Sequence, residues 1–238
     1  MITPPTTARN NGEAKVGTAG GYRPPMQSAR VGIVGNVVAI KWQGGKVTGQ
    51  VSGSGDRGVL LAHGAGTDQD HPVMVATRKA LAAEGLTVMS FNYPYTEAGK
   101  ASPDPQEKLL DCHRSALGVL AKRVSQGVVL AGRSMGGRMG TYLAAADEPI
   151  LGTVCYAYPL HPPGKPEKLR IDHLGDIKVP MLFFQGSRDP LSRSDLFDLH
   201  VRSLPRATVV DMEVDHSLGG LKNVPFLAER TAEWVRAL

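Results

Sequence analysis

The stretch that decides the fold runs from Val128 to Ala146 and begins VVLAGRSMGGRMG. Its first four residues are apolar and favour a strand, and the residues after the glycine pair favour a helix. Between them Ser134 lies in the pattern G-x-S-x-G, in which a tight strand-to-helix turn exposes a serine hydroxyl. Such a turn brings backbone segments too close for most side chains, so glycine is needed at 132 and 136. We therefore predict a strand, a sharp turn and a helix, with Ser134 as a candidate nucleophile.

Strand-like and helix-like segments alternate along the rest of the chain. Predicted strands cover residues 37–42, 47–51, 59–62, 87–93, 128–131, 151–158, 181–185 and 208–214, and further predicted helices cover 72–84, 105–124, 195–204 and 221–238. The first two strands are joined by a glycine turn and form a hairpin. The later strands are apolar almost throughout, which indicates an α/β fold with a mostly parallel central sheet and helices on both faces. Right-handed crossovers bring the carboxyl ends of parallel strands to one edge, so candidate site residues follow the strands.

Length and composition favour one domain. The 238 residues are 42% hydrophobic, which is enough for a single substantial core. Residues 1–28 are rich in Pro, Gly, Thr and Ala and are predicted to be a disordered tail, leaving residues 29–238 as one α/β domain. The tail lacks the apolar stretch of a signal peptide, and no segment approaches the roughly 18 consecutive apolar residues of a membrane span. We expect a soluble, cytoplasmic protein with no membrane partner.

The charge balance raises nucleic-acid binding as an alternative. The net charge is +5 and the pI is about 9.3. However, the basic residues are interspersed with 22 acids and form no basic stripe with aromatics, so we predict a solvated basic surface and no nucleic-acid partner. Such a surface modestly favours anionic substrates. A nucleotide site at Gly32-Ile33-Val34-Gly35 is a weak alternative, because the spacing does not make G-x-G-x-x-G and no helix follows directly.

The two cysteines, Cys112 and Cys155, lie in a helix-like and a strand-like stretch. Both have the pattern of small core residues, which fits a reducing compartment.

Two side chains that follow later strands complete a candidate triad with Ser134. Asp189 follows the seventh predicted strand and His216 follows the eighth. A histidine there can take the serine proton as general base and return it as general acid, while a carboxylate orients the imidazole. The chain order serine, aspartate, histidine is the one expected for a serine on a strand-to-helix turn. Asp215 is the weaker acid candidate, because adjacent residues in an extended loop usually point apart.

The other six histidines are weaker candidates for the base. His63 precedes the serine in the chain and is expected to brace its own loop. His161 follows the sixth strand and is a candidate pocket residue. The remaining four are assigned to helices or turns, at positions 71, 113, 173 and 200.

The turn His63-Gly64-Ala65-Gly66 follows the third strand and is a candidate oxyanion hole. Attack on an ester builds negative charge on the carbonyl oxygen, which needs preorganised donors. We assign these donors to the backbone N–H groups of Met135 and Ala65, with Gly64 as an alternative to Ala65. An ordinary glycine turn is the competing interpretation.

Four side chains near the ends of the fourth and sixth strands are candidate walls of a substrate pocket: Tyr93, Tyr95, Tyr158 and Leu160. Packing of the loops explains them equally well. Arg133, inside the serine turn, either pairs with an acid in a structural role or contacts a substrate carboxylate, and the structural role is favoured. Residues 161–180 are too few and too rich in proline for a large cap, so we predict an open or lightly covered site.

Taken together, these motifs resemble an α/β-hydrolase of the dienelactone-hydrolase-like group, in the branch related to testis-expressed and chromatin-complex hydrolase-like proteins. The resemblance extends over residues 47–238 and rests on HGAG at 63–66, FNYPY at 91–95, GRSMGG at 132–137, QGSRD at 185–189 and Asp215-His216. It implies a Ser-His-Asp serine hydrolase with no metal or organic cofactor, and the short segment 161–180 leaves room for little or no cap domain. Dienelactone hydrolases themselves have a cysteine nucleophile, whereas position 134 is serine, which favours a carboxylesterase acting on small esters. The alternatives are a lactone or thioester hydrolase, and a non-catalytic interaction protein, since some relatives in this branch are thought to be non-catalytic members of complexes.

Overall fold

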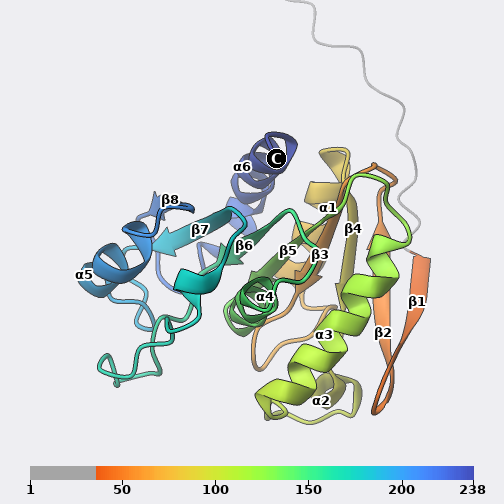
Figure 1. Ribbon diagram of the computed structural model, residues 1–238, viewed down its shortest axis with the longest axis horizontal. Coiled ribbons are helices and arrows are strands. Elements are labelled where there is room, and N and C mark those ends of the chain that lie inside the picture. Colours follow the sequence, from red (N-terminus) through yellow and green to blue (C-terminus); the bar gives the residue numbers. More distant parts are fainter. Residues whose placement is uncertain (1–35) are drawn as a thin grey trace, which may run out of the picture. The chain divides into compact units, whose positions relative to one another are not determined.

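An eight-stranded sheet forms the centre of the described part of the chain, residues 36–238 of a computed structural model (Figure 1). The strand order is β1-β2-β4-β3-β5-β6-β7-β8. The strands are β1 Asn36–Trp42, β2 Gly45–Ser52, β3 Gly58–Ala62, β4 Thr87–Phe91, β5 Val128–Arg133, β6 Gly152–Tyr156, β7 Met181–Gly186 and β8 Ala207–Met212. β2 is antiparallel to β1 and β4, and the remaining neighbours are parallel. The predicted tail, its boundary at residue 29 and the glycine pair at 32 and 35 lie outside the described residues.

Helices cover both faces of the sheet, which confirms the predicted fold class. The α-helices are α1 Pro72–Ala83, α2 Pro94–Glu97, α3 Gln106–Ala121, α4 Met135–Ala145, α5 Ser194–Phe197 and α6 Val224–Arg236. α3 and α4 pack in one apolar cluster with alternate residues of β3 and β5, and α1 and α6 pack in another with the residues between them. This division follows from the strand geometry, because successive side chains point to opposite faces. Figure 1 shows α3 and α4 in front of the sheet and α1 and α6 behind it.

Several element boundaries differ from the prediction, and proline accounts for two of them. β4 ends at Phe91 because Pro94 begins the short helix α2, which the sequence analysis left as a loop. The final helix begins with a 3₁₀ turn, Gly220–Asn223, and becomes α-helical only where Pro225 occupies its first turn. Proline suits the first turn of a helix because its ring fixes φ near the helical value. Backbone N–H groups in that turn have no intrahelical acceptor, so the absence of one from proline costs no hydrogen bond. The predicted helix 195–204 is divided into α5 and a π-helical turn, Asp198–Arg202.

The carboxyl ends of the parallel strands meet at one edge, the lower edge in Figure 1, where α2 lies. The segment between β6 and β7 crosses this edge and contains only a 3₁₀ turn, Leu174–Asp176, as regular structure. A connection with so little regular structure forms no cap domain over the edge of the sheet. The edge therefore stays accessible on the side where the sequence places its candidate site residues.

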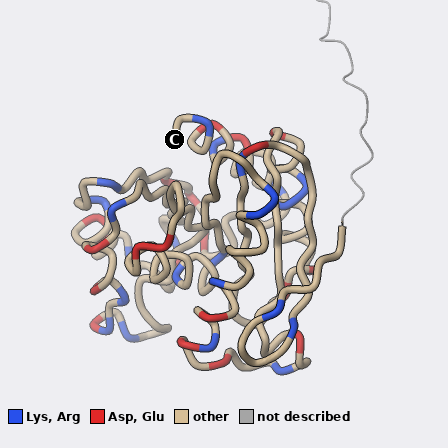
Figure 2. Tube along the Cα trace, turned by 45° about the vertical axis from the view of Figure 1, so that its right-hand side comes forward, with Lys and Arg blue, Asp and Glu red and all other residues tan. Residues whose placement is uncertain are grey.

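Cys112 and Cys155 are both buried and free, Cys112 on α3 and Cys155 on β6. Basic and acidic residues alternate along the trace in Figure 2. Within residues 36–238, none of the helices combines the length and the apolar character needed to span a bilayer.

Candidate active site

Ser134 occupies a strained turn between β5 and α4. Its backbone has φ 49° and ψ −115°, a conformation that costs a non-glycine residue energy and is found mainly where function requires it. The two glycines of the motif are sterically required: a Cβ on Gly132 would lie 2.4 Å from the backbone of Gly136, and a Cβ on Gly136 would lie 2.4 Å from the carbonyl oxygen of Ala62. The Ser134 N–H donates to the Tyr156 carbonyl at 2.9 Å, which fixes the turn against β6. The serine is thereby held at the edge of the sheet.

A continuous hydrogen-bonded chain joins Ser134, His216 and Asp189. The Ser134 Oγ lies 2.9 Å from His216 Nε2, and His216 Nδ1 lies 2.7 Å from Asp189 Oδ2. Asp189 accepts a hydrogen bond from Nδ1–H, so Nε2 is left as the acceptor for the serine hydroxyl. The Asp189 side chain is fully buried, whereas the His216 side chain is 25% exposed. The imidazole is thus anchored on its inner side and accessible to solvent on its outer side.

Asp189 and not Asp215 is the carboxylate that meets the imidazole. Asp189 uses its second oxygen to accept the Leu191 N–H at 2.8 Å, which orients the carboxylate. Asp215 is exposed and accepts the N–H of Ser217 at 2.8 Å, so its side chain caps the turn and is turned away from the serine. The structure therefore brings together the three residues that the sequence analysis selected, and separates the competing acid.

Two other histidines near the site are tied to backbone. His63 is buried, its Nδ1 lies 2.8 Å from the Gly64 carbonyl, and its Nε2 accepts the Tyr93 N–H at 3.1 Å. Burial lowers the pKa of His63, so the ring is neutral and braces the loop. His161 is likewise buried, with Nδ1 3.0 Å from the Pro162 carbonyl, so it presents no free edge as a pocket residue.

The turn after β3 lies directly beside the serine. A Cβ on Gly64 would come within 3.5 Å of the Ser134 Cβ. Met135 is the first residue of α4, where the helix geometry leaves N–H groups without partners. Within residues 36–238, no acceptor takes the N–H of Gly64, Ala65 or Met135. The arrangement leaves backbone donors without acceptors in two segments that adjoin Ser134.

The predicted pocket walls turn out to be core residues. Tyr93, Tyr158 and Leu160 have no exposed surface, so the prediction that they contact a substrate does not hold for them. The Tyr93 hydroxyl lies 3.0 Å from His113 Nδ1, and the Tyr158 hydroxyl donates to the Arg170 carbonyl at 2.6 Å. The physical reason is that later segments of the chain fold back over these strand ends and form hydrogen bonds with the tyrosine hydroxyls. This is the loop packing that was the alternative interpretation of these residues.

Tyr95 is also almost fully buried, but it lines a cavity of about 250 Å³ beside the turn at residues 63–66. Its hydroxyl donates to the Gly64 carbonyl at 3.4 Å. Other walls of this cavity are Thr67 and Lys100. Tyr95 is therefore placed to support the turn from behind.

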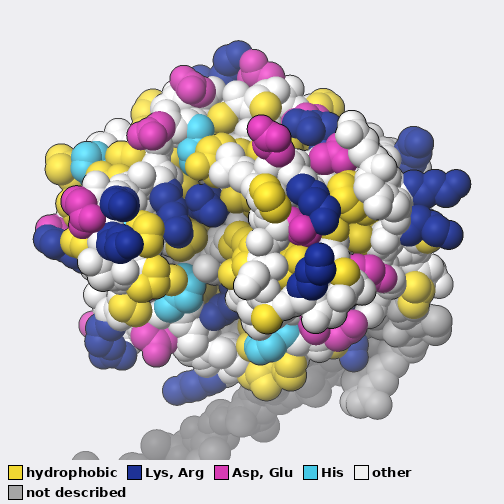
Figure 3. Space-filling view, turned by 90° about the horizontal axis from the view of Figure 1, so that it is seen from below, with side chains coloured by type: hydrophobic (Ala, Val, Ile, Leu, Met, Phe, Trp, Pro, Cys, Tyr) yellow, Lys and Arg dark blue, Asp and Glu magenta, His cyan; other side chains and the backbone are white. Residues whose placement is uncertain are grey.

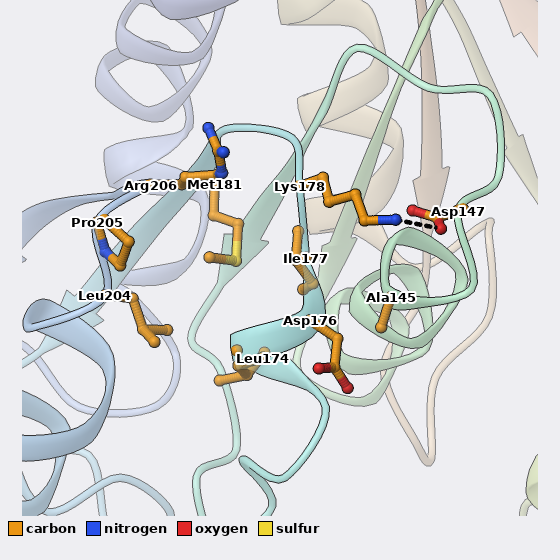
Figure 4. A pocket seen from close by; sticks show the side chains of 11 residues that line it. Ala145, Asp147, Leu174, Asp176, Ile177, Lys178, Met181, Leu204, Pro205 and Arg206 are labelled. Carbon is orange, nitrogen blue, oxygen red and sulfur yellow. Dashed lines mark hydrogen bonds and ion pairs between the residues drawn. The ribbon is translucent and has the colours of Figure 1, made fainter.

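A larger cavity lies elsewhere. It measures about 530 Å³ and is lined by the end of α4, the start of β7 and the residues before β8 (Figure 4). Because those are the amino ends of the strands, this cavity lies at the edge opposite Ser134. Seen from below in Figure 3, the edge with the carboxyl ends of the strands has a hollow with basic and histidine side chains around it.

Arg133 connects the serine turn to the histidine loop. Its guanidinium donates to the carbonyl oxygens of His216 at 3.0 Å and of Ser217 at 3.3 Å. The role is structural, but the partners are backbone carbonyl oxygens and not the acid that was expected from the sequence. The sequence analysis missed two other arginines, Arg138 and Arg170, which lie near the same edge; the only signal was the spacing of four residues between Ser134 and Arg138 on one helix.

Comparisons with known proteins agree with this architecture. Residues 55–234 match the family described as Alpha/beta hydrolase domain. Among solved structures, the chain is similar to an alpha-beta serine hydrolase homologue from Coxiella burnetii (18% identity, 82% of this chain and 96% of that chain, TM-score 0.68). It is also similar to an a/b serine hydrolase without lid from Xanthomonas campestris (21% identity, 84% and 94%, TM-score 0.68) and to an esterase from Pyrococcus furiosus (17% identity, 86% and 93%, TM-score 0.71). The fold, the strained serine turn and the match over most of the chain together place this protein in the alpha/beta hydrolase family.

Proposed function

We propose that this protein hydrolyses carboxylic esters through a Ser-His-Asp triad made of Ser134, His216 and Asp189. The observation that carries the proposal is the hydrogen-bonded chain of 2.9 Å and 2.7 Å that links a hydroxyl, an imidazole and a buried carboxylate. A serine hydroxyl is a weak nucleophile at neutral pH, and this arrangement is the one that activates it.

In the proposed reaction, Ser134 Oγ attacks the ester carbonyl while His216 Nε2 takes its proton. Asp189 stabilises the imidazolium, and the N–H groups of Met135 and Ala65 hold the oxyanion. His216 then protonates the leaving alcohol, and an acyl-enzyme remains on Ser134. Water, deprotonated by His216, attacks this acyl-enzyme; the acid is released and the proton returns to Ser134.

Small or exposed acyl groups suit this site best. The β6–β7 connection is short and contains no cap domain, and a similar structure from Xanthomonas campestris is described as lacking a lid. An open edge offers little apolar surface for a long buried acyl chain. Lactones and thioesters need the same nucleophile, base and donors, so they remain the alternative substrates.

The proposal also includes a branch of the family and a cellular location. The sequence motifs favour the dienelactone-hydrolase-like branch, with serine in place of that group's cysteine nucleophile. The two free, buried cysteines support a cytoplasmic location.

The test is hydrolysis of p-nitrophenyl acetate and butyrate by the full chain, together with labelling by a fluorophosphonate probe. We expect turnover and labelling in the wild type, and neither in a folded Ser134→Ala variant. Circular dichroism checks that this variant keeps its fold. A wild type that neither turns over esters, lactones and thioesters nor reacts with the probe would refute the proposal, and would favour a non-catalytic interaction protein.

A further inference from the structure

The carbonyl oxygen of Gly64, in the turn beside Ser134, is held by three side chains. His63 Nδ1 lies 2.8 Å from this oxygen, the Thr67 hydroxyl donates to it at 3.1 Å, and the Tyr95 hydroxyl donates to it at 3.4 Å. A backbone carbonyl oxygen has two lone pairs, so three donors saturate it. The direction of this carbonyl group is therefore set by its side-chain neighbours.

The imidazole of His63 acts on this carbonyl as a donor. The Tyr93 N–H donates to His63 Nε2 at 3.1 Å, so the proton of the neutral ring is on Nδ1, the nitrogen that faces the Gly64 carbonyl. Burial keeps the ring neutral, because it lowers the pKa of His63. A backbone N–H therefore fixes the tautomer that makes the first of the three hydrogen bonds.

The two hydroxyl donors reach the carbonyl from different segments of the chain. Thr67 belongs to the same turn, and Gly66 just before it has a φ of 72°, in the left-handed region that glycine adopts without steric cost. This conformation reverses the chain, so the Thr67 hydroxyl comes back to the carbonyl three residues earlier. Tyr95 lies on α2 and is almost fully buried. The turn and the helix therefore hold the same oxygen.

The Gly64 carbonyl and the Ala65 N–H belong to one peptide unit. In a planar trans peptide these two groups point in opposite directions, so a carbonyl with a fixed direction also fixes the N–H. Gly64 is buried and Ala65 is exposed, and a Cβ on Gly64 would lie 3.5 Å from the Ser134 Cβ. The Ala65 N–H therefore points away from the three donors, and the residue that carries it is open to solvent.

We propose that Thr67 and Tyr95 are positioning residues for the oxyanion hole, because their hydroxyls hold the Gly64 carbonyl and so keep the Ala65 N–H aimed at the substrate oxygen. This inference rests on the proposed function, since only a reaction that builds an oxyanion needs that N–H. Such a donor is effective when its direction is set before the reaction begins. Gly64 has no Cβ to restrict rotation of its own peptide, so the restraint has to come from other side chains.

The test compares p-nitrophenyl acetate with p-nitrophenyl thionoacetate, in which sulfur replaces the carbonyl oxygen. Sulfur is a weak hydrogen-bond acceptor, so the ratio of kcat/KM for the oxygen ester to that for the sulfur ester reports on the oxyanion hole. Both reactions are followed by release of p-nitrophenol. We expect the full-length wild type to prefer the oxygen ester.

Thr67→Val and Tyr95→Phe each remove one hydroxyl and nearly preserve the shape of the side chain. We expect kcat for the oxygen ester to fall by about tenfold in Thr67→Val and by about threefold in Tyr95→Phe, whose hydrogen bond is longer. The double variant should lose about thirtyfold or more, because a single donor is left on the carbonyl. In each variant KM should change little, and the ratio of the two esters should fall with kcat.

Two further variants are the controls. Thr67→Ser keeps the hydroxyl and should restore the wild-type ratio. Thr77→Val is matched to Thr67→Val, because the Thr77 hydroxyl also donates to a backbone carbonyl, that of Val73 at 2.8 Å, but within α1. It should leave both kcat and the ratio unchanged. Circular dichroism checks the fold of every variant.

The two single variants carry the same comparison if the double variant does not fold. Wild-type rates in the variants, an equal loss on both esters, or a loss confined to KM would overturn the positioning role and leave the esterase proposal standing. An equal loss would mark a general disturbance of the fold, and a loss in KM alone would mark direct contact with the substrate. Absence of turnover and of fluorophosphonate labelling in the wild type instead overturns the proposed function, and the positioning role with it.

Discussion

At the scale of single residues, the environment decides which of two neighbouring carboxylates can work with the imidazole. Asp189 is buried, and its oxygens are divided between a backbone N–H and His216 Nδ1. Asp215 is exposed, and one of its carboxylate oxygens accepts the Ser217 N–H within its own turn. A buried carboxylate beside an imidazole stabilises the imidazolium that forms when the serine proton moves, and an exposed one is screened by water.

Replacing each of these carboxylates by its amide separates their roles. We expect Asp189→Asn to lower kcat for p-nitrophenyl acetate by about 10³- to 10⁴-fold, because the amide no longer stabilises the imidazolium or selects the tautomer. Asp215→Asn, the matched control, should change kcat by less than about threefold, as befits a surface substitution. Steady-state kinetics on folded variants check both, and equal losses in the two variants would contradict the assignment.

At the scale of elements, the serine turn and the histidine loop are coupled by one side chain. Arg133 ends β5 and donates to two carbonyl oxygens of the loop after β8. Arg188 offers a control, because it also donates to a backbone carbonyl nearby, that of Glu213 at 2.6 Å, but from an exposed position outside the proposed triad. We expect Arg133→Gln to lower kcat by about tenfold with little change in KM, since a lost charge-assisted bond loosens the loop. Arg188→Gln should stay within about twofold. Measuring kcat and KM separately for the two variants tests this expectation. A normal kcat in Arg133→Gln would show that the histidine loop does not depend on the Arg133 hydrogen bonds.

The contact between the serine helix and β3 depends on glycine at one position. A Cβ on Gly136 would lie 2.4 Å from the Ala62 carbonyl oxygen and 2.6 Å from that of His63. A Cβ on Gly118, within α3, would meet nothing within 4 Å. Urea unfolding should therefore show Gly136→Ala destabilised by at least about 2 kcal/mol, because backbone atoms must move apart. Gly118→Ala should be stabilised by roughly 0.5–1 kcal/mol, as expected for alanine in a helix interior. The interpretation fails if Gly136→Ala is as stable as the wild type.

At the scale of the whole molecule, a buried histidine links stability to pH. His113 is fully buried on α3, one nitrogen lies 3.0 Å from the Tyr93 hydroxyl and the other has no partner within residues 36–238. Burial lowers the pKa of His113 to about 3 from its ordinary value of 6.5. Between these values the unfolded chain binds a proton that the folded chain does not, so stability falls as the pH falls from 6.5 toward 3.

We expect this histidine alone to cost roughly 2 kcal/mol of unfolding free energy between pH 7 and pH 5. Urea titrations at several pH values measure the slope. His113→Gln should lower the pH dependence of stability by about one bound proton, whatever the absolute stability of the variant. An unchanged slope in His113→Gln would contradict this account.

The sequence by itself determined the fold class, the order of the main strands and helices, and the residues Ser134, His216 and Asp189 that form one hydrogen-bonded chain. These follow from local patterns: apolar strands, a glycine-framed serine, and polar residues after strands whose ends must share an edge. The tertiary structure alone decided which side chains face that edge. Tyr93, Tyr158 and Leu160 have the pattern of pocket walls, yet returning segments bury them. Periodicity reports which face of an element is buried, but not what another part of the chain lays over its end.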